Sequence, residues 1–410
     1  MAAGQESVNP FEKPLTPCLV FGVAGRIGSG SSFVQHSLDK IIKTYGYVPK
    51  TVDISKFFLE EEYDKAFGDF RLGEGESQPE PATNPYVKTD DTSLLTRIVS
   101  LQRRGNHFRD RYGTNILAAL SINWINGDLV ESGAIEDRNI RRAYIIDSLK
   151  HPAEVRLLRD VFGGAFCMVG VVADDSIRKK RLQEHKHIHE KDFDKVSETD
   201  ADERIGHGQQ TLNAIVLSDY FFANNYDIPG KIDSECQRLL NLLFNSDIVT
   251  PRQDEFGMNL ALMAADKSAC LSRQVGAAII TQSGTVLATG HNDVPQFGGG
   301  LYSSESRKDE RCFARSGLCY NDDEKRIITE EILDLLRSEK IKNLGEEQLV
   351  QIRDVLVSRT RLKTLIEFTR AVHAEMDAII SVAREGKIGI VGSTLRALKV
   401  ELCTPFSLLQ

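Results

Sequence analysis

The 410-residue chain has few cysteines, no long apolar run and no excess of positive charge. Its seven cysteines are odd in number and scattered, which favours free thiols or metal ligands over a disulfide framework. No apolar run approaches the roughly 18 residues of a membrane span, and the polar start MAAGQESVNPFEKP lacks the regions of a signal peptide. The net charge of -8 argues against a surface devoted to nucleic acid. We therefore expect a cytoplasmic protein of more than one domain, with no membrane partner.

Short apolar runs alternate with helical patterns through the first half of the chain. Strands are predicted at residues 18–25, 48–54, 142–149 and 165–174, with a last short strand in DYFFANN. Strands that alternate with helices imply right-handed crossover units, so we expect an α/β domain with a doubly wound parallel sheet.

The pattern changes near residues 246–252, where we place a domain boundary. After it come an amphipathic helix in DEFGMNLALMAADKSA and a strand pair in VGAAIITQSGTVLATGHN, joined by a tight turn. Two helical segments follow between residues 322 and 370. A helix containing HAEMDAIISVARE and a strand in IGIVGSTL complete the second half.

Residues 25–32, GRIGSGSS, keep the frame of a phosphate-binding loop, G-x-x-x-x-G-K-[ST], between an apolar strand and a helix. Ser31 stands where the lysine belongs, and Arg26 could supply the missing charge if it points inward. The hydroxyl of Ser32 is the candidate magnesium ligand, and Asp147, at the end of YIID, is placed to hold Mg²⁺ through water. The residues predicted to bind a nucleoside triphosphate are Gly25, Gly28, Ser29, Gly30, Ser31, Ser32 and Asp147. The alternative is a tight glycine turn beside a solvated aspartate.

His373, Ala374 and Glu375 form the H-x-E pattern of zinc nucleobase deaminases, at the start of an apolar-striped helix. In that chemistry His373 would ligate zinc, which lowers the pKa of a bound water, and Glu375 would move the proton without ligating. The alternative is an ordinary helix N-terminus whose dipole favours a glutamate.

The strand pair with its following VP, ahead of HAEMDAI, resembles the deoxycytidylate deaminases. By that resemblance Gly290, Asn292 and Pro295 align with the substrate loop, and Asn292 is the expected sugar contact. With the serine-substituted P-loop in front, the chain resembles the bacterial anti-phage deoxycytidylate deaminases from about Cys18 to Leu395. The resemblance implies zinc, hydrolytic deamination of dCMP or dCTP, a homo-oligomer and, in some relatives, repression by a small RNA.

The family pattern should continue after Leu395 into P-C-x-x-C, but the chain reads RALKVELCTPFSLLQ. Only Cys403 is present there, with Pro405 after it rather than before it. We therefore expect an incomplete zinc site and impaired activity, as in a shortened or frameshifted version of a longer protein. Cys312 and Cys319 could hold a structural zinc or remain plain thiols. His291 could join either site or only end a strand.

The predicted organisation is an N-terminal tail (1–16), a P-loop kinase-like domain (17–247) and a cytidine-deaminase-like α/β/α domain (252–410) that is incomplete at its C-terminus. Two rival interpretations remain open. The chain could be a nucleotide-binding regulatory or kinase-like protein whose deaminase-like domain is inert. It could also be a non-catalytic fragment that binds full-length subunits.

Overall fold

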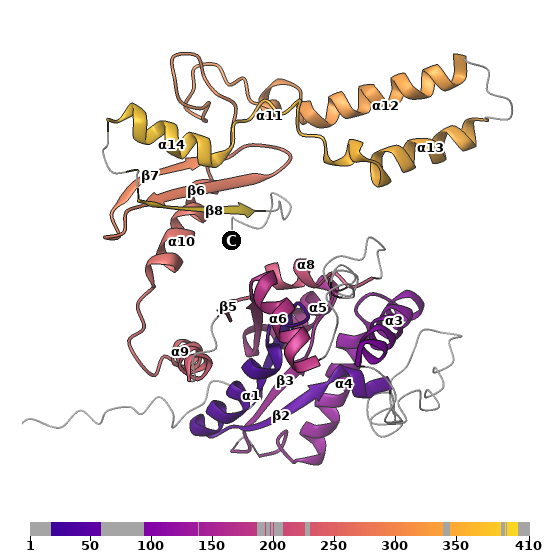
Figure 1. Ribbon diagram of the computed structural model, residues 1–410, viewed down its shortest axis with the longest axis vertical. Helices are drawn as coiled ribbons and strands as arrows, with labels where there is room; N and C mark the ends of the chain where they lie inside the picture. The colour runs from indigo at the N-terminus through magenta and orange to yellow at the C-terminus, as the bar shows by residue number, and fades with distance from the viewer. Residues whose placement is uncertain are drawn as a thin grey trace, which may run out of the picture. The chain divides into compact units, whose positions relative to one another are not determined.

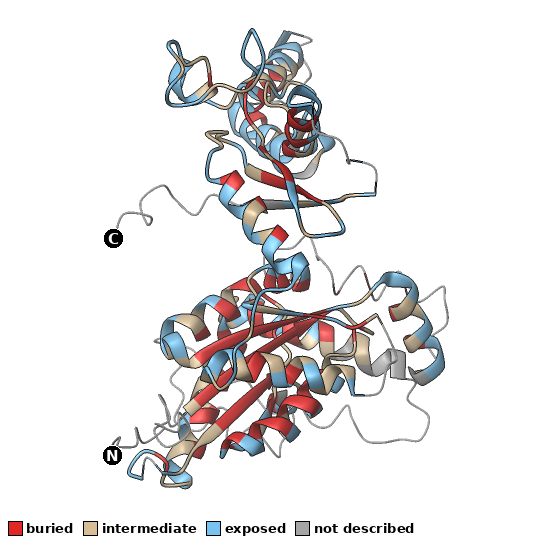
Figure 2. Ribbon diagram, turned by 90° about the vertical axis from the view of Figure 1, so that its left-hand side faces the viewer, coloured by how far each residue is buried: buried red, intermediate tan, exposed pale blue. Residues whose placement is uncertain are grey.

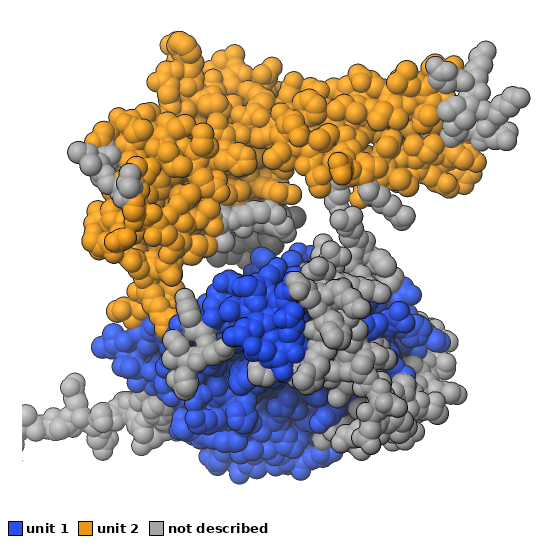
Figure 3. All heavy atoms as spheres, in the orientation of Figure 1, with its two compact units in different colours: residues 1–249 blue, residues 250–410 orange. Residues whose placement is uncertain are grey.

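The computed structural model describes residues 18–58, 94–137, 139–186, 193, 197, 200, 208–225, 230–338, 345–386, 390 and 392–400. The chain divides between Val249 and Thr250 into two compact units, coloured separately in Figure 3. No helix in the described part of the chain is both long enough and apolar enough to cross a bilayer.

The first unit contains a five-stranded parallel sheet (Figure 1). Its strands are β1 (Cys18–Gly25), β2 (Val48–Asp53), β3 (Arg142–Asp147), β4 (Phe166–Val172) and β5 (Tyr220–Ala223). They lie in the order β2-β3-β1-β4-β5. The order reverses direction on either side of β1, which confirms the predicted doubly wound parallel sheet.

Helices cover both faces of this sheet. They are α1 (Ser31–Ile42), α3 (Leu94–Tyr112), α4 (Ile116–Glu131), α5 (Pro152–Phe162), α6 (Asp175–Lys186), α8 (Thr211–Val216) and α9 (Lys231–Phe244), with short 3₁₀ turns between some of them. Alternate residues of β1 enter two separate cores: Val20 packs with side chains of α4, α5 and α8, whereas Phe21 packs with α1 and α9. The inner strands β1, β3 and β4 are therefore almost wholly buried, as Figure 2 shows in red, which explains why β1 and β4 are continuous apolar runs. The edge strands β2 and β5 are more exposed.

The second unit is a three-stranded antiparallel sheet between helices. Its elements are α10 (Gln253–Ala265), β6 (Gln274–Ile280), β7 (Val286–His291), α11 (Cys312–Arg315), α12 (Tyr320–Ser338), α13 (Glu346–Arg359), α14 (Ala374–Arg384) and β8 (Thr394–Val400), and the strand order is β7-β6-β8. Gly276 of β6 faces α10, while the next residue, Ala277, packs against α14. Successive residues of a strand point to opposite faces, so the two helices form the outer layers of the expected α/β/α arrangement.

Helices α12 and α13 form a hairpin between β7 and α14, side by side in Figure 1. They are the two helical segments predicted between residues 322 and 370. The hairpin is an insertion that separates the predicted substrate loop from the H-x-E helix along the sequence.

The strand predicted for residues 388–395 coincides with the observed strand only at its last two residues, and residues 388, 389 and 391 lie outside the described residues. The observed strand β8 begins at Thr394, and its pairing with β6 runs from Thr394 opposite Ile280 to Val400 opposite Gln274. Gly392, with φ of 79°, precedes it in a left-handed turn that an extended strand does not contain. Apolar content alone had favoured IGIVGSTL, but the segment that pairs with β6 is TLRALKV.

Candidate functional site

The phosphate-binding loop joins β1 to α1 through glycines that the fold requires. Gly28 and Gly30 have φ of 81° and 86°, a conformation that other residues rarely adopt. A Cβ on Gly28 would lie 2.8 Å from the carbonyl oxygen of Arg178, and one on Gly30 would overlap the side-chain amide of Asn224. Both positions therefore exclude a side chain by space as well as by backbone conformation.

The loop presents several backbone N–H groups that have no acceptor in the part of the chain that the structure describes. The N–H of Ser29 donates to the carbonyl of Arg26 (2.9 Å), but four others have no acceptor within the described ranges. They belong to Gly28, Gly30, Ser31 and Ser32. Consecutive donors at the start of α1 form a cradle for an anion, reinforced by the helix dipole.

Side chains from α6 and from the end of β5 donate hydrogen bonds to carbonyl groups of the loop. Arg178, buried on α6, donates from Nε to the carbonyl of Ile27 (2.9 Å), and Asn224 donates from Nδ2 to the carbonyl of Ser29 (2.9 Å). Arg26 pairs with Asp175 (3.1 Å) and donates to Ser197 (2.8 Å). The guanidinium proposed to replace the missing lysine is thus already bound to α6 and its neighbourhood.

A cleft of about 440 Å³ opens beside the loop. Its walls include Gly25, Arg26, Ile27, Gly28, Ser31, Ser32, Asp53, Gln102, Arg109, Asp147, Lys150, Asp200 and Gln209. Asp147 ends β3 directly opposite Asp53, the last residue of β2. The structure therefore brings Asp147 and Ser32 to one cleft and adds Asp53, whose carboxylate accepts hydrogen bonds from Ser55. A carboxylate at the end of β2 was detectable from the sequence, because it follows a strand just as Asp147 does.

Lys150 and Asp200 line the same cleft and were both missed from the sequence. The ammonium of Lys150 donates to Asp200 Oδ1 (2.7 Å) and to the carbonyl of Gly25 (3.0 Å). Asp200 Oδ2 accepts from the backbone N–H of Ile27 (2.7 Å). No motif marks Asp200, because it lies in a charge-dense stretch that is typical of a solvated surface.

A buried ion pair fixes the wall of the cleft behind Lys150. Arg109 of α3 donates from Nε to Glu154 (2.8 Å), and both side chains are almost fully buried. Glu154 also accepts from the backbone N–H groups of Lys150 and His151, as part of the capping box that starts α5. Removing either side chain would leave the other as a buried charge without its partner, which is strongly destabilising, so this pair holds the cleft wall in place.

In the second unit, His373 and Glu375 lie at the start of α14. His373 is the N-cap residue, with an extended backbone and an exposed imidazole. Glu375 lies in the first turn and is half-buried, and its Oε2 atom is buried without a hydrogen-bond partner in the described part of the chain. Leaving a buried carboxylate oxygen unpaired costs about 1–3 kcal/mol or more, so this atom is a candidate to contact water or a ligand.

Strand β7 holds this end of α14 tightly. A Cβ on Gly290 would overlap the carbonyl of Ala374 and the N–H of Ala378, so helix and strand are in direct backbone contact. The N–H of His291 donates to Asp377 Oδ2 (3.2 Å). Burial lowers the pKa of His291, although its Nδ1 lies 3.8 Å from the Asp377 carboxylate. His291 therefore ends β7 against the helix.

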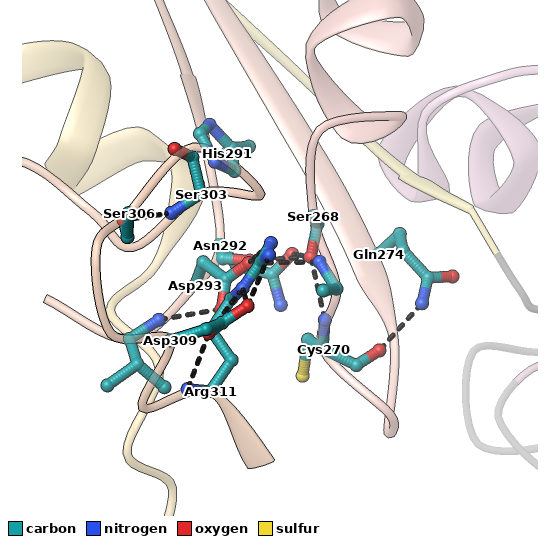
Figure 4. A network of polar contacts seen from close by, with 12 residues as sticks. Ser268, Cys270, Gln274, His291, Asn292, Asp293, Ser303, Ser306, Asp309 and Arg311 are labelled. Carbon is teal, nitrogen blue, oxygen red and sulfur yellow. Dashed lines mark hydrogen bonds and ion pairs between the residues drawn. The ribbon is translucent and has the colours of Figure 1, made fainter. Parts of the chain in front are cut away.

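The loop after β7 is the substrate-loop candidate, and hydrogen bonds hold it in place (Figure 4). Asn292 accepts from Val275 N–H (2.7 Å) and from the Ser268 hydroxyl (2.9 Å), and donates to the carbonyl of Arg273 (2.8 Å). The carbonyl of the next residue, Asp293, accepts from the N–H of Val372, directly before His373. The side chain of Asn292 thus anchors the loop, and its predicted contact with a sugar stays a prediction.

Residues 292–293 and 309–311 form one polar cluster. The Asp293 carboxylate is 1% exposed, accepts from Ala269 N–H (2.9 Å) and lies 3.6 Å from the guanidinium of Arg311. Arg311 in turn pairs with Asp309 (2.7 Å), as the dashed lines in Figure 4 show. This cluster holds residues 309–311 next to the end of β7.

The described residues do not complete a metal site. Within them, no three His, Cys, Asp or Glu side chains gather closely enough to hold a metal ion. Cys312 begins α11 and Cys319 precedes α12; both are half-buried, and burial raises the pKa of Cys319. Cys403 lies outside the described residues. Among described side chains His373 is therefore the one predicted catalytic zinc ligand.

Residues 251–405 match the family described as the cytidine and deoxycytidylate deaminase zinc-binding region. This match confirms the expected deaminase-like domain in the second half of the chain. No curated protein matches the chain.

Solved structures similar to the chain include several small-molecule kinases. An APS kinase from Mycobacterium tuberculosis is 14% identical, covers 56% of this chain and 98% of its own, and has a TM-score of 0.30. A shikimate kinase from Bacteroides thetaiotaomicron is 13% identical, covers 55% and 98%, and has a TM-score of 0.29. A gluconokinase from Sinorhizobium meliloti is 15% identical, covers 56% and 98%, and has a TM-score of 0.27. These scores are too low to support any functional assignment.

Proposed function

We propose that the second unit is a domain for hydrolytic deamination of deoxycytidine nucleotides, dCMP or dCTP, whose activity is impaired in this chain because the P-C-x-x-C segment is lacking. We propose further that the first unit binds a nucleoside triphosphate with Mg²⁺. The observation that carries the deaminase proposal is the buried, unpartnered Oε2 of Glu375, within residues that match a deaminase region. A carboxylate oxygen without a hydrogen-bond partner among the described residues is available to a water or a substrate, which suits a group that moves protons.

Glu375 would act as the proton carrier. In nucleobase deamination the conserved glutamate removes a proton from the attacking water and delivers it to the ring nitrogen and then to the leaving amine. The backbone of α14 packs directly against β7 at Gly290. This contact fixes the first turn of the helix, and with it Glu375, relative to the loop after β7. A substrate held by that loop would then meet a carboxylate of fixed position.

The finer parts of the proposal rest on the sequence resemblance. They comprise the preference for deoxycytidine nucleotides, a role in anti-phage defence through depletion of that pool, cytoplasmic location, a homo-oligomer and control by a small RNA. Zinc at His373 and structural zinc at Cys312 and Cys319 also belong to this set.

A second candidate function is supported by the contrast between the two sites. Among the described residues, four N–H groups of the phosphate cradle have no acceptor and a cleft lies beside them, whereas the predicted catalytic zinc site has one ligand. A nucleotide-binding regulatory or kinase-like protein with an inert deaminase-like domain would show this contrast.

Ammonia release from dCMP and dCTP, measured together with zinc content, separates the two functions. We expect Glu375→Gln to abolish whatever turnover the protein shows without changing its zinc content, because Glu375 moves protons and does not ligate. Glu385→Gln, at the other end of the same helix, is the matched control and should behave as the unaltered chain. Absence of both zinc and turnover, with intact triphosphate binding, would favour the second candidate.

A further inference from the structure

The lysine missing from the phosphate-binding loop has a counterpart elsewhere in the cleft. Lys150 follows β3 by three residues, and its ammonium lies 3.0 Å from the carbonyl of Gly25, the first residue of the loop. Its side chain is 20% exposed and lines the cleft. A flexible ammonium at this distance can contact a phosphate in the cradle, as a loop lysine would.

Lys150 differs from the other cations in the described cleft wall by the position of its partner. Arg26 and Arg109 also line the cleft, but their carboxylate partners, on α6 and α5, do not. Asp200, the partner of Lys150, lines the cleft itself. An anion entering the cleft can therefore reach Lys150 from the cleft side, where it competes directly with Asp200 for the ammonium.

Asp200 makes the contacts that a phosphate oxygen would make. One carboxylate oxygen accepts from the loop N–H of Ile27, and the other accepts from Lys150. Its side chain is 3% exposed, and the hydroxyl of Thr211 lies 3.4 Å from Oδ1. Asp200 thus occupies the edge of a cradle in which the N–H groups of Gly28, Gly30, Ser31 and Ser32 have no acceptor among described residues.

We propose that Lys150 supplies the phosphate-binding charge that Ser31 cannot provide. In the absence of ligand Asp200 pairs with the Lys150 ammonium, and a bound polyphosphate takes the place of the Asp200 carboxylate. The inference rests on the proposed triphosphate binding by the first unit and is independent of deamination. Ligand selection follows from it, because a ligand must bring enough negative charge to compete with an internal carboxylate. A triphosphate meets that requirement better than a monophosphate, and an unphosphorylated nucleoside does not meet it at all.

The test measures binding of inorganic tripolyphosphate and of dCTP to the full chain by calorimetry. Tripolyphosphate has no base or sugar, so it reports on the phosphate contacts alone. Lys150→Met should weaken its binding about 10-fold or more, since a charge-assisted hydrogen bond is lost, and Lys150→Arg should restore most of it. Asp200→Asn keeps the side-chain volume but removes the competing charge, and should tighten binding at least about 3-fold.

The matched controls are Lys40→Met and Asp233→Asn, which break an ion pair of 2.6 Å on the surface of the same unit, outside the cleft. Both should bind tripolyphosphate as the unaltered chain does. They show whether the loss of any lysine–aspartate pair changes affinity through stability or net charge.

Opposite shifts for the Lys150 and Asp200 variants would support the inference. Two results overturn it while leaving triphosphate binding intact: Lys150→Met binds tripolyphosphate as tightly as the unaltered chain, or Asp200→Asn binds it more weakly. If neither the unaltered chain nor Asp200→Asn binds either probe, the proposed triphosphate site fails and the inference fails with it. Binding by Asp200→Asn alone would support it, because the carboxylate would then be the barrier.

Discussion

Substitution of Gly290 by alanine should loosen the helix that carries the proposed proton carrier. The added Cβ would lie 2.9 Å from the Cα of Ala378 and would overlap backbone atoms of Ala374 and Ala378. Carbon atoms pack at about 3.5–4.0 Å, so α14 must move away from β7 by at least about 0.6 Å, the difference between 3.5 and 2.9 Å. Backbone atoms cannot rotate away as a side chain can.

The cost should resemble that of other overpacked cores, about 1–3 kcal/mol of the second unit's stability. For a unit of this size, each kcal/mol lowers the melting temperature by roughly 2–4 °C. The move would also shift Glu375, and a misplacement of about 1 Å can cost a catalytic group roughly 100-fold in rate. Stability and any turnover should therefore fall together.

Chemical unfolding followed by far-ultraviolet circular dichroism, with hydrogen exchange of the α14 amides, measures the effect. Gly345→Ala is the control in the same unit, because the nearest atoms to its Cβ are the end of the flexible Gln348 side chain. Gly276→Ala is the informative comparison, since its Cβ would press on α10 rather than α14. Unchanged stability and α14 exchange in Gly290→Ala would refute the close backbone packing on which the reasoning depends.

Three further predictions concern the loop, the metal and the pH. Gly30→Ala should weaken triphosphate binding in calorimetry, because φ of 86° and the Asn224 amide leave no room for a Cβ; unchanged affinity would contradict this. Asp147→Asn should reduce nucleotide affinity more with Mg²⁺ than without it, whereas equal losses would indicate a structural role. Burial lowers the pKa of His291 from its ordinary 6.5, so the unfolded chain takes up the proton first and the second unit should lose stability as pH falls below about 6.5. His291→Gln should flatten that part of the profile in denaturant titrations, and a profile unchanged by this substitution would exclude His291 as its source.

The fold was largely predictable because its signals are local. The buried strand β1, the glycine loop after it and the helix α1 follow one another in the sequence, and each has a pattern of its own. The strand pair β6–β7 was likewise marked by its tight turn. β8 was misplaced because an edge strand is defined by its pairing with β6, and the sequence before Thr394 is more apolar than the strand itself.

The candidate sites were predictable only where a motif exists. The glycine loop and H-x-E each have a fixed spacing, so Ser32 and Glu375 could be named from the sequence. Lys150 and Asp200 have no such spacing, because α5, β4 and α6 lie between them in the sequence and the two residues are neighbours only in the folded structure. The ion pair of Arg26 with Asp175 depends on the same long-range packing.

Deamination of dCMP and dCTP by two matched chains tests the central claim most directly. One is the 410-residue chain, and the other continues after Leu395 through a P-C-x-x-C segment; each is prepared with and without Glu375→Gln. Since one imidazole and at most one thiolate cannot make the three-ligand site of a catalytic zinc, the account predicts ammonia release only from the continued chain with Glu375 intact. Robust ammonia release by the 410-residue chain, or by the continued chain carrying Glu375→Gln, would contradict it.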